Sequence, residues 1–405
     1  MTAPGAVDAA LGTAVPRPRL WPLATGTFAI GSGSFVMAGL VPSVSAELDI
    51  TVSQVGTLVS VYGFTYAVST PLLTLLVGRV PRRVLMAAAL GLFALAALGT
   101  AFATTYTAVA VLRGLSAVAA GGFTPTATVL AARLAPPGRR GRAVATVFGG
   151  LTTATVLGAP AGNLLGPVLG YRGVYALVGV LALVALVSVL ALVRVPRVVP
   201  RAPAAAPVAD GPPARDRVLP GLVALTLLVS MLETAAALMV QTYSSPLLTD
   251  LAGLTGLLLS AVLLAYGVAG VAGNVVGGRL ADRFGAGRSI VLALGTSTVA
   301  LLLLTPAAAT AWTALAVFAL WGFAAWAMNS PLQNVLLTLA GRHGQLVVAL
   351  NSSVISLGTG VGALLGGWVV AGPGYAALAP AAAALMLAAV VLTLVLTTRP
   401  AVSRV

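Results

Sequence analysis

The sequence contains no cysteine, no lysine and one histidine among its 405 residues. The missing cysteine excludes disulfides, thiol catalysis and most zinc sites. The missing lysine excludes a nucleotide-binding loop of the Gly-x-x-x-x-Gly-Lys-Ser/Thr type. With only 8 acidic residues, little remains from which a metal cluster or a hydrolytic site could be assembled. We therefore expect no enzyme, no ATP-driven pump, no metal and no cofactor.

Charge is scarce as well, at 7% of the residues, whereas 59% are hydrophobic. A soluble domain carries about 25% charged residues, so most of this chain is expected to face lipid. The net charge of +14 could suggest nucleic-acid binding. The arginines are scattered over short loops instead of gathering on one face, so no nucleic-acid partner is expected.

The chain consists of apolar runs that are each long enough to cross a bilayer as a helix, which takes about 20 residues. Six runs precede a segment rich in Pro, Ala and Arg, which is typical of a flexible linker, and six follow it. The expected spans are about 20–46, 54–78, 84–104, 106–134, 143–170, 173–194, 219–245, 253–278, 289–308, 310–340, 345–371 and 375–397. The predicted fold is all-α and integral to the membrane, with twelve transmembrane helices in two six-helix pseudo-symmetric bundles. The expected parts are a cytoplasmic tail (1–19), a first bundle (20–194), a cytoplasmic linker (195–218), a second bundle (219–397) and a second tail (398–405).

One stretch of sequence recurs at half the length of the chain. The ten residues from Leu157 to Gly166 match those from Leu357 to Gly366 at six positions, Leu157, Gly158, Gly162, Leu164, Leu165 and Gly166. Both copies place small residues four apart in an apolar run, which lets two helices approach closely in lipid. The repeat predicts two structural halves with the functional site between them.

Arginine predicts the orientation. If the N-terminus is inside, the loops on that side contain arginine repeatedly, whereas the outer loops contain only Arg172. The positive-inside rule then places both termini in the cytoplasm of a cell whose inner membrane the chain crosses many times. Both halves enter from the same side and are parallel repeats.

Three motifs resemble those of a known family. Residues 278–285 read Gly-Arg-Leu-Ala-Asp-Arg-Phe-Gly, similar to the Gly-x-x-x-Asp-Arg-x-Gly loop of the major facilitator superfamily. The fourth span carries Arg113 followed by Gly121, Gly122 and Pro125, and the fifth carries Gly158, Pro160 and Gly162. The chain looks most like the twelve-span drug:proton antiporters, which include arabinose-efflux-like and chloramphenicol-resistance-like members. The resemblance implies alternating access, export, and a central cavity lined by spans one, four, seven and ten.

Two charges are predicted inside spans. Arg113 lies about 10 Å deep in the fourth span at 1.5 Å per residue, where a charge costs about 2.5–3.5 kcal/mol. Glu233 is the only carboxylate inside a predicted span, in the seventh. Arg113 is either a substrate or proton-relay group or a structural tie to neighbouring helices. Glu233 is either the coupling or substrate site or part of a permanent buried pair, and the two could approach across the cavity.

The first span contains no acidic residue, although proton-coupled members of this family often have one there. We therefore expect Glu233 to have taken over coupling, or coupling to be different or lost. Gly278, Asp282 and Arg283 form the inner loop that the resemblance assigns to a conformational latch; an ordinary tight turn is the alternative. The first-half copy has Arg82 where the second half has Asp282, so a symmetrical latch is not expected.

Other polar and aromatic residues within spans are candidate cavity linings, each with a helix–helix hydrogen bond of about 0.6 kcal/mol as the alternative. They are Tyr62, Tyr66, Gln241, Trp326, Asn329, Gln333 and Asn351. Pro331 predicts a kink in the tenth span. Gly158, Pro160 and Gly162 predict a close-packed, bent interface that can slide.

The leading hypothesis is a secondary active transporter that exports a small drug-like or amphiphilic compound in exchange for protons. The alternatives are an exporter of a sugar or amino-acid-type metabolite, a membrane-embedded enzyme and a non-transporting membrane protein. The expected partners are a small-molecule substrate, protons and the lipid bilayer, with the chain acting as a monomer. One sequence does not rank substrates or coupling stoichiometries.

Overall fold

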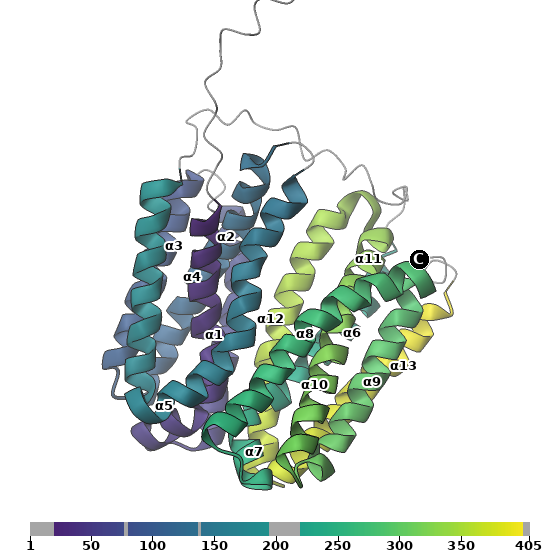
Figure 1. Ribbon diagram of the computed structural model, residues 1–405. Helices are drawn as coiled ribbons and strands as arrows, with labels where there is room; N and C mark the ends of the chain where they lie inside the picture. The colour runs from purple at the N-terminus through teal and green to yellow at the C-terminus, as the bar shows by residue number, and fades with distance from the viewer. Residues whose placement is uncertain (1–19, 77–79, 137–138, 194–218, 400–405) are drawn as a thin grey trace, which may run out of the picture.

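The computed structural model describes residues 20–76, 80–136, 139–193 and 219–399. The expected tail 1–19, the linker 195–218 and residues 400–405 lie outside the described residues. The described residues form helices and no strands (Figure 1). The helices are α1 (Trp21–Leu48), α2 (Val52–Leu76), α3 (Arg82–Phe102), α4 (Tyr106–Leu134), α5 (Arg140–Leu192), α6 (Pro220–Thr242), α7 (Ser244–Ala252), α8 (Gly256–Phe284), α9 (Ala286–Ala307), α10 (Ala311–Ala327), α11 (Asn329–Ala340), α12 (Gly344–Ala371) and α13 (Leu378–Thr397), with short 3-10 turns η1 (Gly341–His343) and η2 (Tyr375–Ala377).

The helical architecture follows from the solvent. Lipid offers no hydrogen-bond partner to a backbone, so a spanning segment must pair its own N–H and C=O groups. The prediction of an all-α membrane fold with twelve spans is confirmed. α5 accounts for two of them, because its 53 residues would extend about 80 Å, whereas the hydrocarbon core is about 30 Å thick.

The chain turns within α5 at Gly170. This residue adopts φ 66° and ψ 172°, a left-handed backbone that glycine accepts without steric cost. The following backbone amide, of Tyr171, donates a 2.8 Å hydrogen bond to the Glu47 carboxylate. Glu47 therefore satisfies a free amide at the start of the sixth span, where the helix dipole also favours a negative charge.

The molecule has two hydrophobic cores, one in each half. One is built from α1 to α5, with Ala363 of α12 attached, and the other from α6 to α13, with Ala159 of α5 attached. Within the first, Gly162 of α5 packs on the backbone of Val36 in α1, and within the second, Gly362 of α12 packs on the backbone of Ala235 in α6. The glycines of the sequence repeat thus make equivalent close contacts inside each half.

The tenth span is broken, as Pro331 predicts. α10 ends at Ala327 and α11 begins at Asn329. Proline lacks the N–H that would bond to the carbonyl four residues earlier, which belongs to Ala327. Gly277 of α8 approaches that carbonyl closely, so the break also brings α8 against the tenth span.

The prediction of a loop at residues 278–285 is wrong. α8 continues to Phe284, well past the predicted end at 278, and α9 starts at Ala286. Gly285, with φ 85°, is the whole connection. Asp282 therefore lies in the last turn of a helix rather than in a loop. The helix dipole does not favour a negative charge in that last turn.

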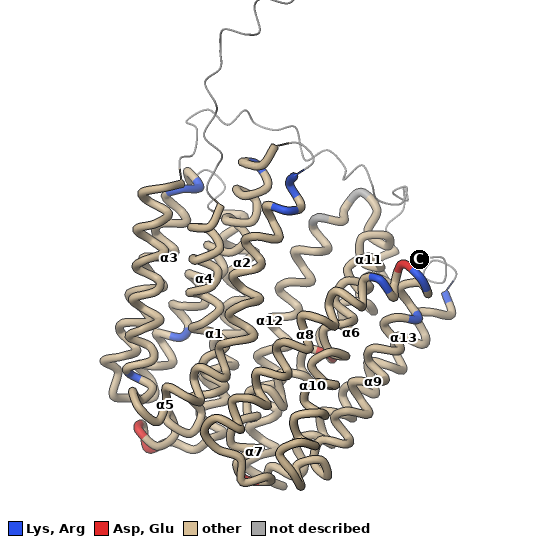
Figure 2. The backbone as a smooth tube through the Cα atoms, viewed as in Figure 1, with Lys and Arg blue, Asp and Glu red and all other residues tan. Residues whose placement is uncertain are grey.

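Basic residues gather at one end of the bundle (Figure 2). This arginine-rich end contains the last turns of α4 and α8 and the first turns of α3 and α5, with Arg133, Arg283, Arg82 and Arg140. The opposite, arginine-poor end contains Glu47 and Asp49 at the end of α1. The two halves diverge toward the arginine-rich end (Figure 1).

Candidate functional site

Arg113 is a buried tie inside the first half. Its side chain is 2% exposed. One guanidinium nitrogen donates to the carbonyl of Gly33 in α1 at 2.8 Å and to the hydroxyl of Tyr175 in α5 at 3.3 Å. Nε donates to the carbonyl of Leu58 in α2 at 3.5 Å. Arg113, on α4, therefore links four helices.

Aromatic rings complete the surroundings of this arginine. The guanidinium lies 4.5 Å from the ring centre of Tyr62, a cation–π contact that a desolvated site strengthens. Tyr62 stacks on Tyr66 with ring centres 6.2 Å apart. The two tyrosines share one face of α2, as their spacing predicts, and Tyr66 is the more exposed of the two.

Glu233 is a buried carboxyl inside the second half. It lies in the middle of α6 and is 7% exposed. Thr234 Oγ1 lies 3.2 Å from Glu233 Oε2 and 2.8 Å from the carbonyl of Ser230. A hydroxyl has one proton to donate and also accepts. If Thr234 donates to the closer carbonyl, its oxygen is left to accept from Glu233, an arrangement that suits a protonated carboxyl.

An aromatic cluster lies beside Glu233. Tyr266 of α8 is close enough to interact electrostatically with the carboxyl. The Tyr266 ring lies 4.6 Å from that of Trp321, and Trp326 packs on Gly270, one turn further along α8. The phenol and the indoles come from α8 and α10, which pack directly on each other.

Arg113 and Glu233 are not joined in this structure. The donors of Arg113 are directed to α1, α2 and α5, and the side chain that contacts the Glu233 carboxyl is that of its neighbour Thr234. Each charge is thus accommodated within its own half. The geometry around Arg113 favours the structural alternative over a direct pair across the cavity.

The two halves meet along two lateral seams. On one, Ser60 Oγ of α2 donates to the carbonyl of Gly360 in α12 at 2.8 Å. On the other, Asn163 Nδ2 of α5 donates to Ser260 Oγ of α8 at 2.8 Å and to the carbonyl of Gly256 at 2.9 Å. Asn163 therefore joins the two halves by hydrogen bonds.

Close contacts of glycines also join the two halves. Gly56 packs against Tyr243, Gly63 against Gly360 and Gly267 against Val156. Among the described residues, the hydrogen bonds and glycine contacts between halves reach from the arginine-poor end to about the middle of α2, α5, α8 and α12. The molecule is therefore closed at the arginine-poor end.

The remaining candidate linings occupy varied positions. Gln333 is exposed, whereas Gln241, Asn329 and Trp326 are half-buried. Asn351 is 4% exposed, and its side-chain oxygen has no hydrogen-bond partner among the described residues. Asn351 is the one among them whose polar atom is both buried and without a partner among the described residues.

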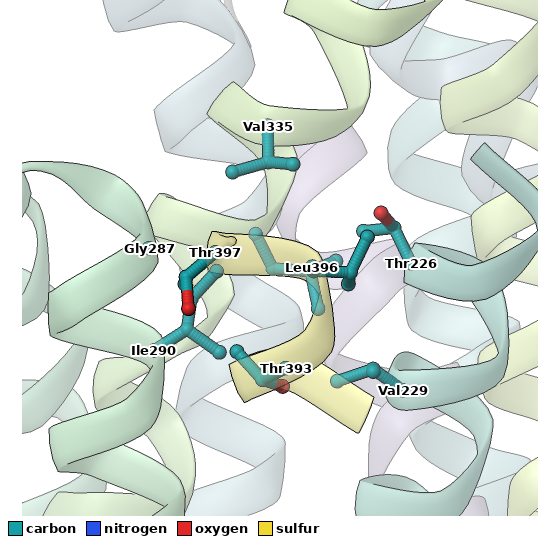
Figure 3. Close-up of a pocket in the computed structure, with 9 residues that line it drawn as sticks. Thr226, Val229, Gly287, Ile290, Val335, Thr393, Leu396 and Thr397 are labelled. Carbon is teal, nitrogen blue, oxygen red and sulfur yellow. The ribbon is translucent and has the colours of Figure 1, made fainter. Parts of the chain in front are cut away.

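A small pocket in the second half is too narrow for an organic substrate. It lies between α6, α9, α11 and α13, and its volume is about 10 Å³, close to that of a single water. Figure 3 shows its lining by apolar groups and threonines, among them Thr226, Ile290 and Thr393. Glu233 does not line it, so we assign it no role in binding.

Comparison with known proteins decides the family. Residues 23–346 match the Major Facilitator Superfamily. The chain belongs to that superfamily. It is similar to a chloramphenicol resistance protein of Streptomyces lividans, with 34% identity over 84% of this chain and 80% of that protein. It is also similar to the inner membrane transport protein YdhP of Escherichia coli K12, with 30% identity over 87% of this chain and 89% of that protein.

A solved structure supports the fold of this superfamily member. A bacterial homologue of the human lysosomal transporter Spinster, in an inward-facing and unoccupied conformation, aligns with a TM-score of 0.71. The identity is 15%, and the alignment covers 94% of this chain and 95% of that one. The expectations of a transporter fold and of a transporter rather than an enzyme are confirmed.

The expected latch is incomplete in this conformation of the superfamily member. Asp282 and Arg283 are both exposed, and Arg283 lies 5.2 Å from the ring centre of Phe284. Gly278 faces Ser330 across the contact between α8 and α11. Among the residues described, no ion pair involves Asp282, so a latch function stays a prediction about another state.

Sequence reasoning missed four residues of this site. Tyr175 and Tyr266 each complete a polar cluster, and Ser60 and Ser260 join the two halves. The tyrosines gave no signal beyond being polar groups in apolar runs. The serines did give one, because they are 260 − 60 = 200 positions apart, the offset of the repeat.

Proposed function

We propose that this transporter exports a small amphiphilic organic compound from the cytoplasm in exchange for protons, with Glu233 as the proton carrier. The observation that carries the proposal is a mid-helix carboxyl, 7% exposed, that has no basic partner among the described residues. A buried carboxylate without a partner costs several kcal/mol. Such a group is stable when protonated and must find water or a cation to ionise.

The conformation supports the direction of transport. By the positive-inside rule the arginine-rich end faces the cytoplasm, and the contacts between halves lie toward the other end. The structure then corresponds to a state open to the cytoplasm, in which an exporter takes up its substrate. Glu233, placed to be protonated here, would release its proton to the cytoplasm as substrate binds.

The chemistry of the surroundings supports the substrate class. Tyr266 lies near Glu233, and Trp326, half-buried on α10, packs one turn along α8 from Tyr266. A phenol and an indole have aromatic faces and polar edges, a combination that holds amphiphilic molecules by stacking and hydrogen bonding. The similarity to a chloramphenicol resistance protein makes chloramphenicol the first compound to test.

The test is transport in inside-out vesicles that contain the full-length protein. With an acidic lumen, chloramphenicol should accumulate in the lumen, and dissipating the pH gradient should abolish accumulation. A panel of cationic and neutral amphiphiles extends the test in the same vesicles. Failure of every compound to accumulate under an imposed pH gradient would overturn the proposal.

A further inference from the structure

A second pocket lies at the arginine-rich end of the first half. Its volume is about 160 Å³, and it is formed where the end of α2, the start of α3 and the second half of α4 meet. Pro125, at its wall, is twelve residues from Arg113 along α4, which is about 18 Å. The pocket is therefore separate from the Arg113 cluster.

Arg82 supplies the charge of this pocket. It is the first residue of α3 and lines the cavity. One of its guanidinium nitrogens is buried and has no hydrogen-bond partner among the described residues. Thr74 and Thr126 also line the pocket, but their hydroxyls donate to the carbonyls of Thr70 and Gly122. A bound group would thus receive its hydrogen bonds from Arg82.

A second positive charge adds to the field. Arg133, in the last turn of α4, is near enough to interact repulsively with Arg82. The acidic residues described in this half, Glu47 and Asp49, lie at the arginine-poor end. Two arginines that repel each other beside a cavity, with no described carboxylate at hand, are favourable for an anion.

The rest of the lining is apolar. Leu73, Leu85 and Val129 form the wall beside Arg82, and Leu75 and Leu76, next along α2, are 80% and 77% exposed. Basic pockets between helices at the cytoplasmic side of a membrane accept acidic lipid headgroups, whose acyl chains remain on the apolar surface.

We propose that this pocket binds a phosphate group through Arg82, with Arg133 adding attraction. The group is the phosphodiester of an acidic phospholipid or a free phosphate ion, since both present the same oxygens to a guanidinium. Binding offsets the repulsion between Arg82 and Arg133 with a negative charge and fixes the start of α3 against α2 and α4. The bound form is therefore the more stable one.

The test uses the full-length protein in phosphatidylcholine nanodiscs, with melting temperature as the measurement. Phosphatidylglycerol is added to the discs in graded amounts, or inorganic phosphate is added to the buffer. Arg82→Gln removes the charge at similar length, and Arg142→Gln removes an exposed arginine at the same end. Gly122→Leu fills the cavity with Arg82 in place, and therefore decides the matter if Arg82→Gln does not fold.

A rise in melting temperature with phosphatidylglycerol is expected in the wild type and in Arg142→Gln. In Arg82→Gln the response should require about tenfold more lipid, the effect of losing one charge-assisted hydrogen bond. A rise with inorganic phosphate that Arg82→Gln lacks assigns the site to a free anion. Equal responses of both arginine variants, a full response of Gly122→Leu, or no response of the wild type to either probe would overturn the proposal.

Discussion

The hydroxyl of Ser60 lies 2.8 Å from the carbonyl oxygen of Gly360, and this contact has a pseudo-symmetric counterpart. Ser260 Oγ lies 3.4 Å from the carbonyl oxygen of Pro160, and 260 − 60 and 360 − 160 are both 200. Both serines are buried, at 3% and 4% exposure. The two seams that close the arginine-poor end are thus related by the same offset as the sequence repeat.

Removing both hydroxyls should shift the equilibrium away from the state seen here. An interhelical hydrogen bond in a membrane contributes about 0.6 kcal/mol, so the double variant Ser60→Ala, Ser260→Ala should change the ratio of states roughly sevenfold. The chain has no cysteine, so spin labels can be placed on Gly141→Cys and Arg288→Cys without background. The distance distribution between them should move toward shorter values.

Ser352→Ala is the matched control for this experiment. Ser352 lies on α12 like Gly360, but its hydroxyl donates to the carbonyl of Val348 within the same helix. Its distribution should equal that of the wild type. If the double variant also equals the wild type, the seams do not stabilise the closed end.

The repeated glycines should be intolerant of alanine. A Cβ at Gly162 would overlap the carbonyl of Val36, and one at Gly362 would overlap the carbonyl of Ala235. Backbone cannot move aside as a side chain can, so either substitution should destabilise the fold by about 1–3 kcal/mol. Melting temperatures in detergent measure the effect.

Glycines in open space provide the opposite expectation. A Cβ at Gly149 or at Gly295 would have no neighbouring atom within 4 Å, and alanine within a helix is favoured over glycine by about 0.5–1 kcal/mol. Gly149→Ala and Gly295→Ala should therefore melt at or above the wild-type temperature. Equal melting temperatures for all four variants would show that close helix contact is not what these glycines provide.

Substitution of Arg113 should lower the stability of the fold, and any loss of transport should follow from that. Arg113→Met removes donors to Gly33, Leu58 and Tyr175, and unsatisfied buried groups cost about 1–3 kcal/mol. Arg113→Lys keeps the charge but cannot reach all three acceptors, so its melting temperature should fall by less. Arg140→Met, at an exposed arginine, should melt as the wild type does. A lysine variant that melts normally but no longer transports would instead place Arg113 at the substrate.

The sequence was sufficient for the architecture because lipid leaves few choices. Spans, their number and the two halves follow from apolar runs, and the offset of 200 correctly related Gly162 to Gly362. The same offset applied to polar residues would also have found Ser60 and Ser260. The position of Asp282 was mispredicted because a helix can continue through charged residues once it leaves the hydrocarbon, and only Gly285 stops it.

Partners within the site were harder to predict. An arginine in a span requires hydrogen-bond acceptors, but a sequence does not indicate which backbone carbonyls will serve. Arg113 donates to two backbone carbonyls and to Tyr175. Glu233 was singled out as an intramembrane carboxyl, whereas the nearness of Tyr266 depends on how α8 packs on α10 within the second half.

Glu233→Gln should separate coupling from transport. Glutamine is neutral, as a protonated carboxyl is, so the side chain still fits beside Thr234 and Ser230. The variant should melt at or above the wild-type temperature, because it has no buried charge to accommodate. In inside-out vesicles it should equilibrate substrate down a gradient but fail to concentrate it with an acidic lumen.

The dependence of the transport rate on pH should also distinguish Glu233→Gln from the wild type, and its direction is predicted. In the proposed mechanism, proton release to the cytoplasm precedes or accompanies substrate uptake, so wild-type transport should accelerate as the cytoplasmic-side buffer is made more alkaline. Glu233→Gln should show a flat profile, since it has no proton to release at this position. Asp250→Asn, at an exposed carboxylate on α7, should keep both the slope and the accumulation. A sloping profile in Glu233→Gln with undiminished accumulation would move the coupling function to another residue.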